Sequence, residues 1–280
     1  MILLRKPEEV QNLITELKSS HKSIGFVPTM GALHSGHISL VNQSTSENDF
    51  TLVSIFVNPT QFNNPEDLKK YPRTEKQDAA LLETAGVDAV FLPSAESLYP
   101  NGEDSEHFDF NGLENQMEGK FRSGHFDGVA TIVQKFFKLI QPDKAYFGEK
   151  DFQQLRIIQE LVKQHNLSVE IVPVEIKRES DGLAMSSRNM RLSPEMRNES
   201  TEIYRILTAA KSFLKFNSIQ KTKEFVKKEF AKTNLKLEYF EIADETSLLP
   251  ISELKENQKI RGFIAAFAED IRLIDNMSLN

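Results

Sequence analysis

The sequence contains no cysteine, and this absence excludes several kinds of chemistry. Disulfide bonds, catalysis by a thiolate, and zinc or iron–sulfur sites with cysteine ligands all need that residue. No segment approaches the roughly 18 consecutive apolar residues of a membrane-spanning helix. The apolar start of the chain, Met1 to Leu4, is also far too short for a signal peptide. These features predict a cytoplasmic protein that does not contact a membrane.

The chain also lacks a net positive charge and repetitive sequence. Its net charge is -7, so no broad basic field favours nucleic acid or an anionic membrane as a partner. We find no repeat, low-complexity tract or long linker. Charged residues make up 27% and apolar residues 39% of the 280 residues, which is ordinary for one large or two modest globular domains.

The first part of the chain alternates between strand and helix patterns. Helical spacing of apolar residues is found around 7–17, 75–85, 129–140 and 155–162, and short apolar runs between these segments predict strands at 23–27, 51–57, 87–92, 145–147 and 169–174. Strands that alternate with helices pair in parallel through right-handed crossovers. The expected fold class is therefore α/β, with a Rossmann-like doubly wound parallel sheet assigned to residues 1–176.

The pattern changes beyond residue 177. Two helices are predicted first, at 193–214 and 220–232, and strands follow around 235–242, 260–267 and 271–274. Helices followed by strands are typical of an α+β unit. We therefore expect a smaller α+β domain at residues 177–280.

The first candidate site follows the 23–27 strand. Ligands of open parallel sheets bind beyond the carboxyl ends of the strands. The helix expected from His37 presents free N–H groups and a positive dipole end to an anion, and Gly36 lets the backbone approach a phosphate. His34 and His37 are suited to donating hydrogen bonds to phosphoryl oxygens. The predicted phosphate site comprises Met30, Gly31, Ala32, Leu33, His34, Ser35, Gly36 and His37.

Two other interpretations of the histidine pair are less favoured. Histidines three residues apart can share a metal ion, but no glutamate follows His34 as a metalloprotease helix requires. Gly36 also argues against a helix that already includes this segment. An arbitrary pair of histidines at this spacing also commonly lies in a loop, where the two rings are only solvated or packed in the core and bind no ligand. The position between a strand and a helix, with flanking glycines, favours phosphate binding.

Polar residues follow two other predicted strands. Asn58 and Gln61 come after the 51–57 strand, and their uncharged amides suit hydroxyl and carboxylate oxygens, although such pairs more often make turns. The run Gly148, Glu149, Lys150 and Asp151 follows the 145–147 strand. Lys150 would bring a charge near phosphates, and Gln154 lies one turn further on.

Two further segments carry candidate residues. Arg122 and His125 stand near the start of the 129–140 helix, where they are either substrate-binding residues or neighbours of a helix cap. The apolar stripe of that helix is expected in the core, with no ligand beyond its first turn. The junction between the domains holds a candidate triphosphate clamp in a loop suited to act as a lid, namely Met185, Ser186, Ser187 and Arg188.

Together and in this order, these stretches resemble the pantothenate synthetase (pantoate–β-alanine ligase) family of HxGH nucleotidyltransferases. The matching stretches are PTMGALHSGH at 28–37, IFVNPTQF at 55–62, YPRT at 71–74, GHFDGVATIV at 124–133, FGEKDFQQL at 147–155 and DGLAMSSRN at 181–189.

The resemblance implies a reaction. Enzymes of this family use ATP and Mg²⁺ to convert (R)-pantoate into pantoyl adenylate with release of pyrophosphate, and the amine of β-alanine then displaces AMP. It implies that residues 30–37 and 148–151 contact ATP, with His37 as proton donor and Lys150 on the phosphates. Gln61 and Gln154 would hold pantoate, with Gln61 also near β-alanine. Residues 185–188 are similar to the KMSKS loop of class I aminoacyl-tRNA synthetases. The metal ligands are not indicated, and a homodimer is expected.

One position departs from the family pattern. Lys177 stands where the family commonly has valine, at a position thought to touch adenine. The change is tolerable if that contact uses backbone groups, and it impairs adenine binding if the contact uses the apolar side chain.

The chemistry agrees with the resemblance. Adenylation needs in-line positioning and stabilisation of charge on phosphorus rather than a pair of carboxylates. The small domain would exclude water from the acyl adenylate. One alternative is another HxGH nucleotidyltransferase acting on a phosphate ester, a substrate that should demand more basic residues than Gln61 and Gln154. A second alternative is a regulatory protein that binds a nucleotide without turnover.

Overall fold

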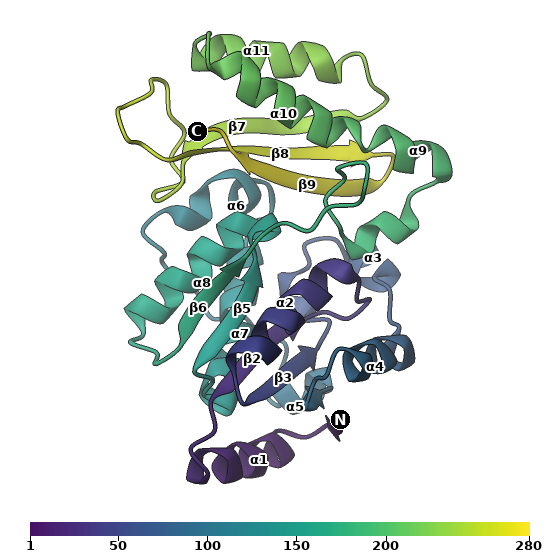
Figure 1. Ribbon diagram of the computed structural model, residues 1–280, viewed down its shortest axis with the longest axis vertical. Coiled ribbons are helices and arrows are strands. Elements are labelled where there is room, and N and C mark those ends of the chain that lie inside the picture. Colours follow the sequence, from purple (N-terminus) through teal and green to yellow (C-terminus); the bar gives the residue numbers. More distant parts are fainter.

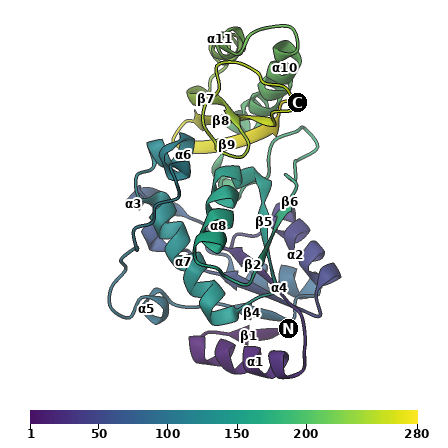
Figure 2. The ribbon, with the colours of Figure 1, turned by 90° about the vertical axis from the view of Figure 1, so that its left-hand side faces the viewer.

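Alternating side chains of the parallel strands point to two different helix layers. In the computed structural model, which describes residues 1–280, Phe26 and Leu52 face a core shared with the helices α1 (Pro7–Ser19), α7 (His125–Ile140) and α8 (Phe152–Gln164). Their neighbours Val27 and Val53 face a second core shared with α2 (Ser35–Glu47) and α4 (Glu75–Thr84). Because both faces are covered, the strands are apolar throughout, as is typical of a buried parallel sheet. Figure 2 shows the sheet between these layers.

The six-stranded sheet and its helices occupy the first 174 residues (Figure 1). Its strands are β1 (Ile2–Leu4), β2 (Ile24–Thr29), β3 (Phe50–Ile55), β4 (Ala89–Phe91), β5 (Lys144–Gly148) and β6 (Glu170–Val174). Its α-helices are α1 (Pro7–Ser19), α2 (Ser35–Glu47), α3 (Pro65–Lys70), α4 (Glu75–Thr84), α5 (Ala95–Leu98), α6 (Met117–Phe121), α7 (His125–Ile140) and α8 (Phe152–Gln164). Short 3-10 helices are η1 (Pro59–Gln61), η2 (Leu113–Asn115) and η3 (Glu149–Asp151).

The strand order creates a crevice at one edge of the sheet. The order is β1-β4-β3-β2-β5-β6, and all neighbouring pairs are parallel. From β2 the chain first builds outward through β3 and β4, and it then returns to place β5 on the other side of β2. This reversal leaves an opening between the loops that follow β2 and β5, which is where open α/β sheets bind ligands. The expected α/β fold class is confirmed.

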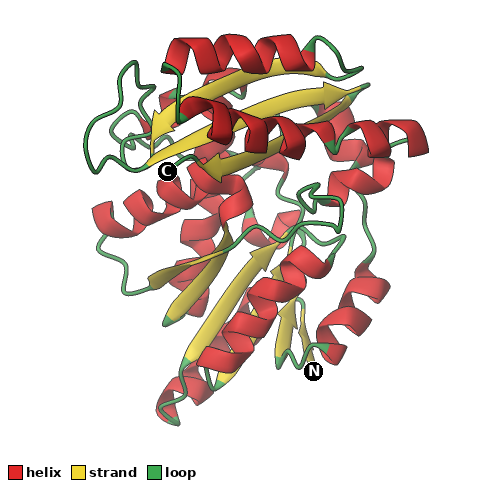
Figure 3. Ribbon diagram, turned by 45° about the horizontal axis from the view of Figure 1, so that its top comes forward, coloured by secondary structure: helices red, strands yellow, loops and turns green.

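The remaining chain forms a smaller layered unit (Figure 3). After η4 (Ser187–Arg191) come α9 (Pro194–Glu199), α10 (Glu202–Leu214), α11 (Ile219–Phe230), β7 (Lys236–Asp244), β8 (Ile260–Ala268) and β9 (Ile271–Ser278). The three strands form an antiparallel sheet, and α10 and α11 share its core. The expected boundary at residue 177 lies in the connection between β6 and η4. We retain that division into domains as a proposal.

Several local expectations need correction. Strand β1 was not expected, because it has only three residues and because Ile2 and Leu3 are 47% and 52% exposed, so no buried pattern marks it. The single helix expected at 193–214 is two helices, because the amide of Ile203 bonds to the carbonyl of Ser200 and tightens the chain there. The short helices α3, α5 and α6 also lack a periodic signal. No helix combines the length and apolar character needed to cross a membrane.

Buried charges join the small unit to the large one. Arg272 of β9 donates two hydrogen bonds to Glu118 of α6, at 2.7 and 2.8 Å, and also binds Glu238. Tyr239 donates its hydroxyl to the same Glu118 carboxylate at 2.7 Å. Burial raises the pKa of Glu118, but the Arg272 guanidinium outweighs it and holds the pKa at about 2. The carboxylate is therefore charged and paired inside the interface.

We expect Arg272→Ala to lower the free energy of unfolding by about 3–5 kcal/mol, because it leaves Glu118 buried without its cation. The pKa of Glu118 is lowered from a usual value of 4.5 to about 2. The contribution of its charged form to the free energy of unfolding is therefore complete above pH 4.5 and is lost as the pH falls toward 2. Chemical denaturation at several pH values measures both effects. Lys163→Ala, which removes an exposed partner of Glu160, is the control and should change little. Equal effects of the two substitutions would contradict this role of the buried pair.

Candidate functional site

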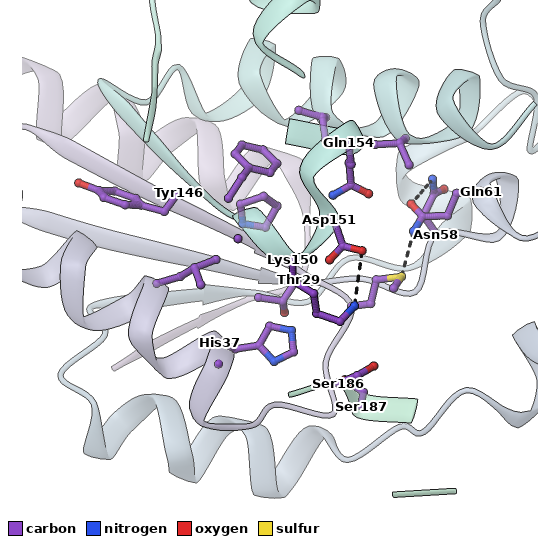
Figure 4. Close-up of a pocket in the computed structure, with 18 of the residues that line it drawn as sticks. Thr29, His37, Asn58, Gln61, Tyr146, Lys150, Asp151, Gln154, Ser186 and Ser187 are labelled. Carbon is purple, nitrogen blue, oxygen red and sulfur yellow. Dashed lines mark hydrogen bonds and ion pairs between the residues drawn. The ribbon is translucent and has the colours of Figure 1, made fainter. Parts of the chain in front are cut away.

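A cavity of about 220 Å³ lies at the carboxyl ends of β2, β3 and β5, in the crevice that the strand order creates (Figure 4). The loops after these three strands and after β6, helix α7, and the segment 185–188 at the start of η4 all reach it. The structure thus brings together residues from widely separated parts of the chain. The predicted site residues that line it are Met30, His34, Gly36, His37, Asn58, Gln61, Arg122, His125, Gly148, Lys150, Asp151, Gln154, Lys177, Met185, Ser186, Ser187 and Arg188.

Five predicted residues do not line the cavity: Gly31, Ala32, Leu33, Ser35 and Glu149. Gly31 and Ala32 adopt positive φ angles of 78° and 50°, which form the tight turn after β2. Ser35 is exposed at the start of α2. Glu149 lies 3.5 Å from Arg261 of the small unit. These side chains therefore shape or support the loops rather than face the cavity.

The two histidines of the HxGH segment cap α2 reciprocally. The Gly36 amide donates to His34 Nδ1 at 3.1 Å, and the His34 amide donates to His37 Nδ1 at 3.3 Å. The helix therefore begins at Ser35, two residues before the expected start, and Gly36 belongs to its first turn. A Cβ atom at Gly36 would lie 2.8 Å from the His34 ring. Gly36 makes room for the folded-back imidazole, so the argument that it excludes a helix here is wrong.

These caps determine which ring nitrogen can donate. Because both Nδ1 atoms accept from backbone amides, the neutral rings must carry their hydrogen on Nε2. Desolvation, with the Lys150 charge adding to it, lowers the pKa of His34 to about 4. Desolvation, the neighbouring His34 and Lys150 together lower the pKa of His37 to about 3. Both rings are thus neutral near pH 7 in the ligand-free protein. Their centroids lie 4.1 Å apart, so they form one compact pair of N–H donors.

The neutral ring of His125 is the tautomer opposite to that of His34 and His37. Its Nδ1 lies 2.8 Å from the carbonyl oxygen of Gln61, which can only accept, so Nδ1 carries the hydrogen. Desolvation lowers the pKa of this buried ring to about 3, with the Arg122 charge adding to the effect. The remaining Nε2 is then an acceptor. The site therefore contains two imidazoles that donate through Nε2 and one that accepts through it.

The three amide side chains differ in how much of their hydrogen-bonding capacity is free. Asn58 is buried, receives the Tyr99 hydroxyl at 2.8 Å and donates to the Gly128 carbonyl at 3.1 Å. Its Nδ2 also lies 3.3 Å from Gln61 Oε1, and Gln61 Nε2 lies 3.0 Å from the sulfur of Met30. Gln154 makes no side-chain hydrogen bond. Gln154 is thus free, Gln61 is oriented, and Asn58 is occupied by the protein.

The Lys150 loop is supported from the small unit. Asn276 of β9 donates to the carbonyls of Glu149 and Lys150, both at 2.9 Å. The Lys150 ammonium lies 3.7 Å from Asp151, and Figure 4 shows it reaching toward the same space as His37 and Ser186. The position of this charge therefore depends on contacts between the two units.

The segment 185–188 is docked against the large unit. The Ser187 hydroxyl donates to the Ala32 carbonyl at 3.0 Å, and the Met185 amide donates to the Lys177 carbonyl at 3.0 Å. Arg188 binds Asp67 of α3 at 2.8 Å. The exposed Lys177 thus touches this segment through its backbone, while its side chain extends into solvent at the rim of the cavity.

One wall of the cavity is apolar, which the sequence interpretation missed. Val129, Ile132, Val133 and Phe136 of α7 line it, although no ligand was expected beyond the first turn of this helix. The same helix also packs against the sheet, so its cavity-facing residues look like core residues in the sequence.

Asp78 is a supporting residue that no sequence pattern selects. This buried carboxylate accepts the amides of Ala32 at 2.9 Å and Leu33 at 2.8 Å, and the Thr74 hydroxyl at 3.1 Å. It therefore holds the turn that carries the HxGH histidines. An aspartate in the first turn of a helix is ordinary because it favours the dipole, so no local signal marked this contact.

We expect Asp78→Asn to lower the free energy of unfolding by about 1–3 kcal/mol, because one of the two buried amides then loses its acceptor. Chemical denaturation measures the change, and amide hydrogen exchange should accelerate at residues 32 and 33. Asp104→Asn, at an exposed position without a side-chain hydrogen bond, is the matched control. Unchanged exchange at both amides would show that Asp78 does not hold this turn.

The site has no group of three or more histidine, aspartate or glutamate side chains placed to hold a metal ion. A cation that entered the cavity would need most of its ligands from a substrate or from water.

Comparison with known proteins places the whole chain in one family. A family model for pantoate-beta-alanine ligase matches residues 2–278. The chain is 50% identical to the pantothenate synthetase of Christiangramia forsetii, with 100% of both chains covered. It is 46% identical to that of Bacteroides fragilis, over 99% of this chain and 98% of the relative.

Solved structures agree with the sequence relatives. The pantothenate synthetase of Thermus thermophilus matches with a TM-score of 0.92 and 39% identity, over 100% of this chain and 99% of that one. The pantoate-beta-alanine ligase of Francisella tularensis, complexed with beta-gamma ATP and beta-alanine, matches with a TM-score of 0.84 and 36% identity, over 100% and 98%. On its sequence, its fold and the placement of its loops, the chain belongs to the pantoate–β-alanine ligase family.

Proposed function

We propose that the cavity binds ATP and pantoate together and joins pantoate to β-alanine through a pantoyl-adenylate intermediate. As a member of its family, the chain is a ligase of pantothenate biosynthesis, and ATP is its co-substrate. The observation that carries the proposed mechanism is the convergence of phosphate-binding groups and neutral amides on one cavity. The first group can stabilise charge on phosphorus, and the second can hold a carboxylate nucleophile without neutralising it.

The phosphate end of the cavity would be formed by His34, His37, Lys150 and Arg188. The Nε2–H groups of the two histidines donate to phosphoryl oxygens as pyrophosphate leaves, and the two cations balance the triphosphate charge. Negative charge near His37 raises its pKa from the low value of the ligand-free protein, which supports the expected proton-donor role. The Ser186 hydroxyl hydrogen is available to a phosphate. Ser187 instead fastens the lid, because its hydroxyl already binds Ala32.

The pantoate end would be formed by Gln61 and Gln154 opposite the apolar wall of α7. Pantoate carries hydroxyl and carboxylate oxygens, which amides can bind, and two methyl groups on one carbon. The methyl groups fit against Val129, Val133 and Phe136, where they leave water. The Asn58 amide is held by the Gly128 carbonyl, and from this position it donates to Gln61 Oε1. Asn58 thus orients the Gln61 side chain. Arg122 and His125 stand beside Gln61 and would face the β-alanine end of the site.

The adenine end would use backbone groups near Lys177. The Lys177 side chain is exposed, so the loss of the family's valine leaves the backbone of this segment in place. Gly148, Met185 and the turn at Met30 complete this part of the lining.

Mg²⁺ fits the site as a companion of ATP rather than as a resident ion. The only carboxylates that line the cavity are Asp151 and Glu175, which together make no closed set of ligands. Mg²⁺ commonly binds through substrate phosphates, waters and one or two carboxylates. Asp151, beside Lys150, would hold it, and the ion would add charge stabilisation at the phosphates. Its direct test is ATP binding measured with and without Mg²⁺.

The second step needs access for an amine and exclusion of water. The acyl adenylate is open to hydrolysis, so closure by the segment 185–188 and the small unit favours the amine over water. The contacts of Asn276 and Ser187 keep these parts against the cavity.

Pyrophosphate release with different acceptors tests the proposed function. ATP with pantoate should release pyrophosphate, whereas ATP with phosphopantetheine should not. The opposite result would favour a nucleotidyltransferase acting on a phosphate ester. ATP binding without pyrophosphate release, with pantoate or any other small carboxylic acid, would favour a regulatory protein.

We expect His37→Ala to slow adenylation about 100- to 1,000-fold, because the transition state loses a preorganised donor. Pantoate-dependent ATP–pyrophosphate exchange measures this step. His107→Ala, at an exposed histidine, is the control. A His37→Ala rate within threefold of the parent would remove His37 from the mechanism.

We expect Gln154→Ala to raise the KM for pantoate at least about tenfold, because buried substrate oxygens lose a partner. The Kd for ATP, measured by calorimetry, should stay within about twofold of the parent. Gln164→Ala, on the exposed end of the same helix, is the matched control. Equal losses for pantoate and ATP would mean that Gln154 only supports the fold.

Two broader expectations remain proposals. We propose that the protein acts as a homodimer in the cytoplasm, as the family resemblance implies. Light scattering that gave only the 31.9 kDa monomer at micromolar concentration would contradict the first, and fractionation of cells would test the second.

A further inference from the structure

Asp67 of α3 lies outside the phosphate and pantoate ends of the cavity, yet it contacts two residues of η4. Its Oδ2 accepts from Arg188 Nη2 at 2.8 Å, and its Oδ1 accepts from Arg191 Nη1 at 2.7 Å. Each carboxylate oxygen thus holds one arginine of η4. The Asp67 side chain is 24% exposed, so solvent weakens these pairs only in part.

The contact with Arg188 leaves most of its guanidinium free. Only Nη2 has a protein acceptor, whereas Nη1 and Nε make no hydrogen bond to the protein. The guanidinium carbon lies 5.8 Å from the centre of the Tyr71 ring, within the range of a cation–π contact. A guanidinium held at one edge presents its other N–H groups in a defined direction, which suits two oxygens of an anion such as a phosphate.

The way in which Asp67 binds Arg188 indicates that it orients this arginine and does not compete with a phosphate for it. A carboxylate that masked Arg188 against phosphate would be expected to bind it bidentately, as Arg272 binds Glu118. Asp67 instead divides its two oxygens between two arginines, so the group of three retains one net positive charge. The Ser187–Ala32 hydrogen bond holds the segment 185–188 against the large unit through a contact that does not involve Asp67.

We propose that Asp67 is a positioning residue for adenylation: it holds the Arg188 guanidinium at one edge and aims the free edge at the triphosphate. The proposal rests on the proposed function, since it takes Arg188 as a phosphate ligand. Asp67 acts only through the arginines and touches no substrate. Its loss should therefore impair the step in which pyrophosphate leaves and spare the step in which the amine attacks.

Asp67→Asn keeps the size of the side chain but provides one acceptor oxygen and no charge. We expect kcat/KM for ATP in pantoate-dependent ATP–pyrophosphate exchange to fall about 10- to 100-fold, as for other displaced catalytic groups. Conversion of supplied pantoyl adenylate by β-alanine should stay within about threefold of the parent. Asp270→Asn is the matched control: Asp270 also approaches Arg191, at 3.6 Å, but does not contact Arg188.

A double-variant cycle separates positioning from support of the fold. If Asp67 acts through Arg188, adding Asp67→Asn to Arg188→Ala should change the exchange rate less than about twofold. Multiplicative losses, equal losses in both half-reactions, or parental activity of Asp67→Asn would each overturn the proposal. Faster exchange in Asp67→Asn would also overturn it, because Asp67 would then mask Arg188. Failure of the parent chain itself to exchange pyrophosphate with pantoate would instead contradict the proposed function.

Discussion

The parallel pairing of β2 with β3 on one side and β5 on the other is the constraint on which the site depends. Each strand delivers its following loop to the same edge, so the HxGH segment, the Gln61 loop and the Lys150 loop meet although they are far apart in sequence. Because both faces of the sheet are buried under helices, the strands cannot shift without exposing a core. The rigid sheet thus fixes the positions from which three polar loops act.

The electrostatics of the cavity follow from how its charged and neutral groups are held. Backbone amides set the tautomers of His34 and His37, and the Gln61 carbonyl sets the opposite tautomer of His125. Neutral imidazoles avoid electrostatic repulsion with the nearby Lys150 ammonium. In the function that we propose, the negative charge of a triphosphate would make the same imidazoles better hydrogen-bond donors.

Most carboxylates around the site bind the protein rather than a ligand. Asp78 holds the HxGH turn, Glu118 joins the small unit to α6, and Asp67 holds the arginines of η4. This arrangement explains why a site for phosphate chemistry contains many acids nearby but few in its lining. Four cations and two carboxylates line the cavity, namely Arg122, Lys150, Lys177 and Arg188, and Asp151 and Glu175. Glu118 and Asp67, the acidic partners of Arg122 and Arg188, are not part of this lining.

Apolar periodicity and the chemistry of strand-end loops are local properties. The residues alone therefore predict the α/β class, the main strands and helices, and the candidates HxGH, Gln61, Lys150 and Arg188. Which of these candidates face the cavity depends on the folded chain. The tertiary structure showed Asn58 and Ser187 bonded to the protein, Gln154 free, and part of the buried α7 stripe lining the cavity. It also revealed Asp67 and Asp78, whose partners lie 121 and 46 residues away. Contacts at such separations arise from the folding of the chain, and no local pattern of residues encodes them.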